Sequence, residues 1–142
     1  MIELIPISGN YDISQHTEEP IKSALEATFE YYEKIGITVP WISYIAKAQS
    51  DFVGICSFKG KPIENKVEIA YYTFQQHEGN GYATAMCKNL IDIAHKERKD
   101  IIISARTLPE KNASTSVLVK NGFSFARTVV DYEDGEVYEW VL

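Results

Sequence analysis

The chain has 142 residues, of which 45% are hydrophobic and 24% charged, and its formal net charge is -6 at pH 7. This length and composition predict one soluble globular domain, residues 1–142, with one hydrophobic core. The acidic balance argues against a nucleic-acid or membrane-surface partner, because both need a basic face. The longest apolar runs are strand-sized and the N-terminus lacks a signal-peptide pattern, so a cytoplasmic location is expected.

The first half of the chain is predicted to hold a strand, a helix and three further strands. Apolar periodicity and turn signals place them at 1–8, 17–35, 41–48, 52–58 and 67–74. In the helix, Thr17 is expected to cap the N-terminus, with Glu18 and Glu19 near its positive end. Pro20 suits the first turn, and Gly36 ends the helix.

The second half alternates helices and strands and then closes with a hairpin. The predicted elements are a helix at 83–98, a strand at 101–105, a helix at 112–120, and strands at 123–131 and 137–142. The strand at 101–105 is continuously apolar and is expected to be buried on both faces. Asp134-Gly135 is typical of a hairpin turn. This order predicts an α+β (mixed α/β) fold on one central sheet.

Cysteine and histidine usage predicts neither a disulfide nor a metal site. Cys56 falls in an apolar strand-like run and Cys87 on the apolar face of a predicted helix. A free thiol in such a place usually behaves as a small buried hydrophobe. His16, His77 and His95 are scattered, and no two of them have the spacing of metal ligands.

The most informative motif is the loop at 76–84, which reads Gln-His-Glu-Gly-Asn-Gly-Tyr-Ala-Thr and joins a predicted strand to a predicted helix. Glycines before a helix leave backbone N–H groups free, and the helix N-terminus adds a partial positive charge; together these favour a phosphate. The loop lacks the pattern of a P-loop, and Gly79, Gly81 and Thr84 only half match a dinucleotide fingerprint. On the glycines alone, a tight turn before a helix is the alternative.

The residues around this loop carry a family resemblance. Gln76-x-x-Gly79-x-Gly81 resembles the (Arg or Gln)-x-x-Gly-x-(Gly or Ala) signature of the GNAT superfamily of acyl-CoA-dependent N-acetyltransferases. The similarity continues at 67–71, 107–110, 113–114, 117–123 and 134–140, and resembles the branch of ribosomal-protein N-terminal acetyltransferases. The resemblance implies a mostly antiparallel, twisted sheet of about six to seven strands. That sheet would be splayed in the middle and flanked by three to four helices.

The resemblance implies acetyl-CoA as the acyl donor, with direct attack by a primary amine through a tetrahedral intermediate. It places the pyrophosphate on the backbone of Gln76, Gly79, Asn80, Gly81, Tyr82, Ala83 and Thr84. The pantetheine arm would run along Tyr72, Thr73 and Phe74, where the amide of Thr73 or Phe74 would stabilise the oxyanion. Glu78 stands where the family often has a basic residue, and is expected to face solvent.

Two side chains are candidates for proton transfer. Glu68 matches a glutamate proposed as the general base in this branch, which a mostly protonated amine needs; the alternative is a simple exposed-face residue. Leu118 occupies the position of the usual proton-donating tyrosine, so Ser114, which aligns with a serine of this branch, is the candidate acid. The alternative role for Ser114 is to cap a helix. The family's cofactor-contacting asparagine falls on Lys111, and either Asn112 or Lys111 would replace it.

The acceptor is expected between the first helix and the last hairpin. Acidic residues there would attract a cationic amine, or would be ordinary solvated faces: Glu26, Glu30, Glu33, Asp131, Glu133 and Asp134. Trp41 is a candidate for the pocket wall. A protein N-terminus, a small amino compound or polyamine, and an aminoglycoside-like molecule all stay open, and a homodimer is compatible with the sequence. The competing functions are a non-catalytic acyl-CoA-binding sensor or interaction module, and a nucleotide-binding domain without acyl chemistry.

Overall fold

The computed structural model describes residues 2–142 as one seven-stranded sheet with helices on both faces. The strands are β1 (Glu3–Pro6), β2 (Ser43–Ala48), β3 (Asp51–Phe58), β4 (Lys66–Thr73), β5 (Ile102–Thr107), β6 (Ser124–Asp131) and β7 (Gly135–Val141). The α-helices are α1 (Ile21–Ile35), α2 (Tyr82–Glu97) and α3 (Ala113–Lys120). Two short 3-10 helices, η1 (Ile13–Gln15) and η2 (Gln75–His77), complete the fold.

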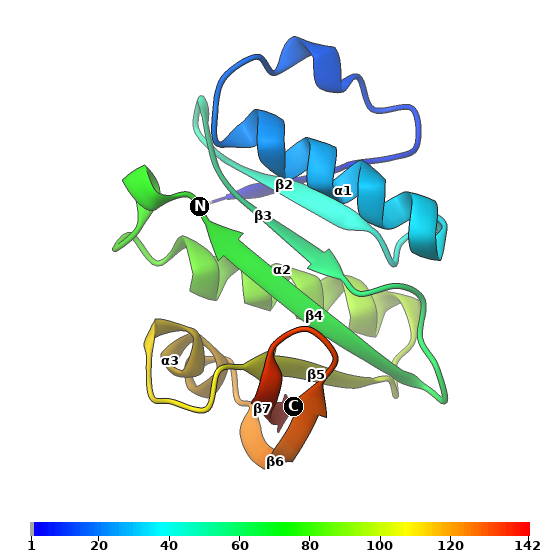
Figure 1. Ribbon diagram of the computed structural model, residues 1–142, viewed down its shortest axis with the longest axis vertical. Coiled ribbons are helices and arrows are strands. Elements are labelled where there is room, and N and C mark those ends of the chain that lie inside the picture. Colours follow the sequence, from blue (N-terminus) through cyan, green and yellow to red (C-terminus); the bar gives the residue numbers. More distant parts are fainter. Residues whose placement is uncertain (1) are drawn as a thin grey trace.

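The strand order is β1-β2-β3-β4-β5-β7-β6 (Figure 1). Neighbouring strands are antiparallel, with the exception of the parallel pair β4–β5. The parallel pair arises because α2 connects β4 to β5, and a crossover helix returns the chain in the same direction. This confirms the predicted mixed α/β fold on a mostly antiparallel sheet.

The sheet opens between β4 and β5. The parallel ladder pairs Lys66–Ile69 with Ile102–Ala105 and ends there, although β4 continues to Thr73 and β5 to Thr107. Beyond Ile69 the two strands therefore diverge. This opening is the predicted splay in the middle of the sheet, and it leaves backbone groups of both strands without a strand partner.

Helices cover both faces of the sheet, and the core lies between the helices and the strands. Figure 1 shows α1 in front of the sheet and α2 behind it. Each buries one face at helical spacing. The buried residues are Leu25, Thr28 and Tyr32 in α1, and Met86, Cys87, Leu90 and Ala94 in α2. Cys56 is buried as well, and both thiols are free, as expected.

Across residues 2–142, no helix is long and apolar enough to cross a bilayer.

An ion-pair cluster around one buried carboxylate ties the C-terminal hairpin to β4. Glu139 of β7, only 6% exposed, accepts hydrogen bonds from Lys66 Nζ of β4 at 3.2 Å and from Arg127 Nε of β6 at 2.9 Å. Burial would raise the pKa of Glu139, but the two hydrogen-bonded cations outweigh it and hold that pKa below its usual range. Three strands are thereby tied together at one carboxylate.

Several predicted boundaries are wrong. The first helix begins at Ile21 rather than near residue 17, because Pro20 disfavours helical backbone at the preceding Glu19. Thr17 therefore caps nothing. Instead, the Glu19 carboxylate accepts a hydrogen bond from the backbone N–H of Ser23. In β5, Ile102 is 43% exposed, so burial on both faces fails at that position. The two 3-10 helices were not predicted.

Candidate functional site

A cavity of about 490 Å³ lies where the glycine loop, the end of β4 and the start of α3 meet; we name it the loop cavity. The residues expected at the cofactor that line it are Tyr72, Thr73, Gly79, Gly81, Tyr82, Ala83 and Thr84. Ser114 lines it too, as do Tyr71, His77, Ser116 and Lys120. Two segments that are separate in the sequence, 71–84 and 113–120, thus build one site.

The glycine loop has the backbone conformation that only glycine adopts freely. Gly79 and Gly81 have φ values of +83° and +79°, and a Cβ added at either would meet no atom within 4 Å. Gly81 is the N-cap of α2 and gives it no side-chain cap, whereas Asn112 caps α3 through the N–H of Thr115. The first N–H groups of α2 therefore face an open cradle, which fits a phosphate group.

Backbone amides at the end of β4 differ in availability. The Phe74 N–H donates to the carbonyl oxygen of Val53 in β3 at 2.9 Å, and Phe74 is fully buried. The prediction that the Phe74 amide stabilises an oxyanion is therefore wrong, because its donor is already used. N–H groups alternate in direction along a strand, so the Thr73 amide points away from β3, toward the opening.

Three other predicted cofactor residues lie outside the loop cavity. Gln76 and Asn80 are exposed, and the Asn80 side chain donates to the carbonyl oxygen of His77 at 3.0 Å, bracing the loop itself. Asn112 caps α3 and lines a different cavity. Lys111 is exposed, lies two residues before α3 and does not line the loop cavity. Glu78 is exposed at the rim of the loop cavity, in keeping with its expected solvent-facing position.

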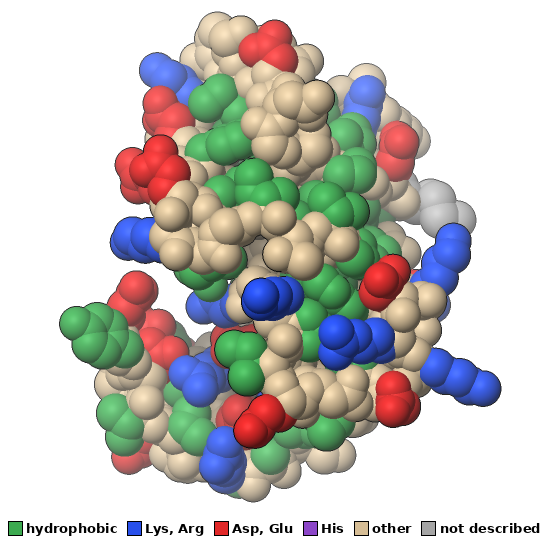
Figure 2. Space-filling view, turned by 90° about the vertical axis from the view of Figure 1, so that its right-hand side faces the viewer, with side chains coloured by type: hydrophobic (Ala, Val, Ile, Leu, Met, Phe, Trp, Pro, Cys, Tyr) green, Lys and Arg blue, Asp and Glu red, His purple; other side chains and the backbone are tan. Residues whose placement is uncertain are grey.

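Another cavity, of about 260 Å³, lies between the middle of β4, the end of β5 and the C-terminal hairpin; we name it the charged cavity. Its lining includes Glu68 and Ala70 of β4, Lys59, Arg106 of β5, Asn112, Ser114, and Asp131 and Asp134 of the hairpin. Figure 2 shows a hollow at the level where the sheet opens, with acidic and basic side chains interspersed around it. The cavity thus combines carboxylates and cations within a small volume.

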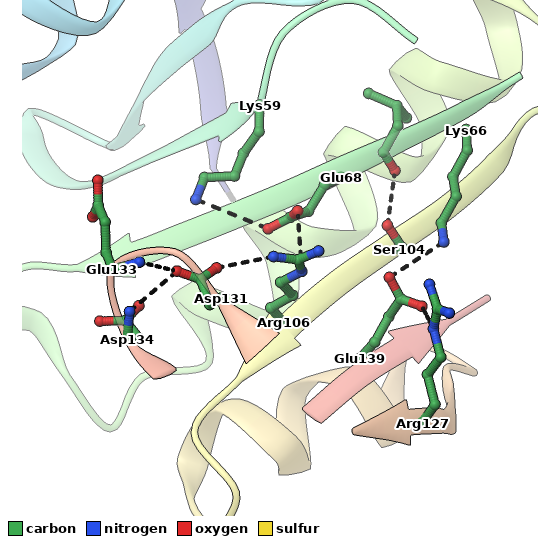
Figure 3. A network of polar contacts seen from close by, with 11 residues as sticks. Lys59, Lys66, Glu68, Ser104, Arg106, Arg127, Asp131, Glu133, Asp134 and Glu139 are labelled. Carbon is green, nitrogen blue, oxygen red and sulfur yellow. Dashed lines mark hydrogen bonds and ion pairs between the residues drawn. The ribbon is translucent and has the colours of Figure 1, made fainter. Parts of the chain in front are cut away.

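Glu68 is held at the centre of this charged cavity. Its carboxylate lies 3.9 Å from Lys59 Nζ and 3.6 Å from Arg106 Nε, and Arg106 also donates to Asp131 at 2.9 Å (Figure 3). Burial raises the pKa of Glu68 above its ordinary value, and Lys59 and Arg106 offset this only in part. The N–H groups of Glu133 and Asp134, with Arg106, hold the pKa of Asp131 below its usual range.

The two cavities meet at Ser114, which lines both. Ala70 lines the charged cavity and the next residue, Tyr71, lines the loop cavity. The loop cavity is lined by Tyr71, Tyr72 and Thr73, and the charged cavity by Glu68, Ile69 and Ala70, so the two cavities adjoin along β4 where the sheet opens. We name their junction at Ser114 the passage. The Tyr71 hydroxyl donates to the backbone carbonyl of Ser114 at 3.0 Å and fastens the first turn of α3 beside this passage.

Sequence reasoning missed Arg106 and Tyr71. Arg106 comes directly after the predicted apolar strand 101–105, and Tyr71 is an aromatic residue within a strand, so neither stood out. Their partners are distant in sequence: Asp131 for Arg106 and Ser114 for Tyr71. Burial raises the pKa of Tyr71 well above its usual range, so the phenol stays protonated. His77, weighed only as a metal ligand, lines the loop cavity. Among residues 2–142 no three His, Cys, Asp or Glu side chains gather as metal ligands would.

The residues expected on the acceptor side lie in different places. Asp131 and Asp134 line the charged cavity, but the acidic residues of α1 lie exposed outside it: Glu26, Glu30 and Glu33. Trp41 is a core residue, 5% exposed and packed edge-on against Phe58, and it does not line the charged cavity. The acidic character of the site therefore comes from β4 and the hairpin.

The sequence is similar to that of a curated bacterial protein. YkkB, an uncharacterised protein of Bacillus subtilis (strain 168), is 32% identical over 85 residues, which cover 58% of this chain and 49% of YkkB. The match thus spans about half the length of that curated relative.

The structure resembles solved acetyltransferases. RimL, a ribosomal L7/L12 α-N-protein acetyltransferase in complex with coenzyme A, aligns with a TM-score of 0.71 at 16% identity, over 99% of this chain and 93% of that chain. Mycobacterium smegmatis RimJ in complex with CoA-disulfide gives 0.68 at 19% identity, over 98% and 68%. Aminoglycoside acetyltransferase AAC(6')-Ib with coenzyme A gives 0.63 at 17% identity, over 71% and 65%.

At these low identities the structural likeness establishes the fold, in agreement with the predicted splayed sheet. The family model of the acetyltransferase (GNAT) domain matches residues 8–124, which is most of the chain. The chain therefore belongs to the GNAT acetyltransferase family.

Proposed function

We propose that residues 1–142 act as a single acetyltransferase domain that moves an acetyl group from acetyl-CoA to a primary amine. The observation that carries this proposal is the passage between two unlike cavities, with Ser114 in the wall of both. One cavity has a phosphate cradle at the N-terminus of α2, and the other has carboxylates suited to a cationic amine. Acetyl-CoA, when bound, supplies an acyl group activated as a thioester.

On the donor side, the uncapped N–H groups of α2 and the glycine loop bind the pyrophosphate. Lys120 and His77 line the same cavity. Lys120 provides a positive charge near the phosphates, whereas Glu78 stands where the family often has a basic residue. The Thr73 amide, turned toward the opening, donates to the acyl oxygen as negative charge develops there. These roles need no side chain from the glycines, which instead let a ligand approach the backbone closely.

On the acceptor side, Glu68 takes the proton that the amine must lose, directly or through a water molecule. The amine nitrogen then forms a bond to the acyl carbon, and the carbon–sulfur bond breaks. The Ser114 hydroxyl, which lines both cavities, hydrogen-bonds the leaving sulfur and relays to it the second proton that the attacking nitrogen gives up, so the hydroxyl is restored. Leu118, at the position where the family usually has the proton-donating tyrosine, is fully buried in the core and has no proton to donate.

The proposal is tested by following CoA release from acetyl-CoA with a panel of amines. The panel holds peptides with free N-termini, polyamines and aminoglycosides, because the charged cavity favours a cationic amine without selecting among them. We expect saturable CoA release with at least one class, and a raised melting temperature with acetyl-CoA but not with ATP or NAD. Stabilisation by ATP or NAD alone would overturn the proposal, and tight acetyl-CoA binding without turnover would favour a sensor.

The charged cavity predicts a specific pH dependence. If Glu68 works as the base, kcat/KM falls with decreasing pH as Glu68 becomes protonated. Arg106→Gln removes a cation that lowers the pKa of Glu68, so the acid limb should move to higher pH. Asp131→Asn removes an anion that raises this pKa, so the limb should move to lower pH.

Rate profiles between about pH 5 and pH 9 measure these shifts. Arg106→Lys keeps the charge and should restore most of the wild-type profile. Lys88→Gln is the matched control, because Lys88 pairs with Asp92 on the exposed face of α2. An acid limb that stays in place in Arg106→Gln would contradict the assignment of Glu68 as the base.

A further inference from the structure

Two cations stand beside Glu68 in the charged cavity, and they differ in how they are paired. Figure 3 shows Glu68 between Lys59 and Arg106. Arg106 donates to Asp131 at 2.9 Å, so it has a carboxylate of its own besides Glu68. Lys59 Nζ lies 3.9 Å from the Glu68 carboxylate, too far for a hydrogen bond, and within residues 2–142 Glu68 is its only ion-pair partner. An acceptor ammonium that binds Glu68 therefore leaves Lys59 without an anion.

The backbone fixes Lys59 opposite Glu68 and leaves its side chain accessible. Lys59 directly follows β3, and its N–H donates to the Glu68 carbonyl oxygen at 2.8 Å, which continues the β3–β4 ladder by one residue. Residues directly opposite each other in such a ladder have side chains on the same face, and both line the charged cavity. The Lys59 side chain is 46% exposed, and an ion pair of this kind contributes little to stability. The Lys59 ammonium is thus free to bind a ligand.

A simple monoamine fits this arrangement poorly. Its ammonium would enter beside Glu68 as a third positive charge next to Lys59 and Arg106, and like charges at such short distances repel. An acceptor with a carboxylate next to its amine removes the conflict, because the carboxylate neutralises Lys59 while the ammonium pairs with Glu68. In an α-amino acid one carbon carries both groups, which suits two side-chain charges only 3.9 Å apart.

We propose that the acceptor is an α-amino acid, whose carboxylate accepts hydrogen bonds from Lys59 while its amine faces Glu68. This rests on the proposed function, because it names the acceptor of the same reaction. The cavity volume of about 260 Å³ supports a small acceptor, since sites for drug-sized ligands span roughly 300–1,000 Å³. Lys59 then determines specificity by binding a part of the substrate that does not react, and the products are an N-acetyl amino acid and CoA.

Matched acceptors test the proposal. The common α-amino acids are compared with their carboxamides, which keep the side chain and the amine but lack the carboxylate. With CoA bound to the wild type, titration calorimetry should give the preferred amino acid a Kd about tenfold below that of its carboxamide. Lys59→Gln should raise the Kd of the amino acid about tenfold and leave that of the carboxamide unchanged or lower. Lys59→Arg keeps the charge and should keep most of the preference.

The ratio of kcat/KM between amino acid and carboxamide gives a second readout. Lys59 also lowers the pKa of Glu68, but the loss of this effect acts on both acceptors alike, so the ratio isolates the carboxylate contact. Lys61→Gln is the matched control, because Lys61 is exposed two residues later and lines neither cavity.

Two results would overturn the assignment of the acceptor. One is equal affinity of the wild type for amino acids and carboxamides, and the other is a preference for the amino acid that survives in Lys59→Gln. The proposed function would still stand if other amines support CoA release. Wild-type protein that neither binds acetyl-CoA nor releases CoA with any amine would overturn the proposed function itself.

Discussion

Replacing Glu68 with glutamine is expected to lower kcat/KM for acetyl transfer by about 10²- to 10⁴-fold, the range that positioned general bases contribute. Glutamine has the shape of glutamate but cannot take a proton from the amine. Glu68 lines the charged cavity and not the loop cavity, in which CoA is proposed to bind. The Kd for acetyl-CoA should therefore stay close to the wild-type value.

The same substitution should leave the fold intact. Burial raises the pKa of Glu68 in the folded state, so above that pKa the ionised carboxylate weakens the fold relative to the unfolded chain. A neutral glutamine relieves this, and the melting temperature at neutral pH should be unchanged or higher. Glu26→Gln, on the exposed face of α1, is the control and should be kinetically silent. Full turnover in Glu68→Gln would exclude a role as base.

The parts of the site that follow from local sequence were predictable. Gly79 and Gly81 adopt backbone angles that glycine alone tolerates well, so their spacing between a strand and a helix is a direct mark of the cradle. Glu68 stood out because a charged residue interrupts an apolar strand. In both cases the physical requirement falls on the residue itself and on its immediate neighbours.

Features that depend on distant partners were not predictable. Arg106 gains its position from Asp131, twenty-five residues later, and from Glu68 on the neighbouring strand β4. The sequence left both the Thr73 and the Phe74 amides as candidates for the oxyanion, because it does not reveal which side of β4 each N–H faces. The hydrogen bond from Phe74 to Val53 excludes the second. The first helix was predicted to begin too early, because Glu18 and Glu19 suggested a helix N-terminus. In the structure Pro20 determines where the helix begins.

Gly54→Ala is expected to destabilise the protein by about 2–3 kcal/mol, the upper part of the range for overpacking a core. A Cβ at Gly54 of β3 would lie 2.4 Å from the Tyr72 carbonyl oxygen, 2.9 Å from Met86 Cε and 3.2 Å from Thr73 Cα. The first contact is with backbone, so no side-chain rotation relieves it. The strands β3 and β4 would have to move apart. Urea unfolding measures this as a lower midpoint with an unchanged slope.

The displaced residues connect this packing defect to the site. Tyr72 and Thr73 line the loop cavity, so the folded Gly54→Ala protein should also bind CoA more weakly, whereas Glu68→Gln should not. Gly9→Ala is the matched control, because its added methyl would meet only the end of the Ile37 side chain, at 3.2 Å, which can turn aside. Gly54→Ala with wild-type stability and wild-type CoA affinity would mean that close contact between β3 and β4 does not hold the donor site in shape.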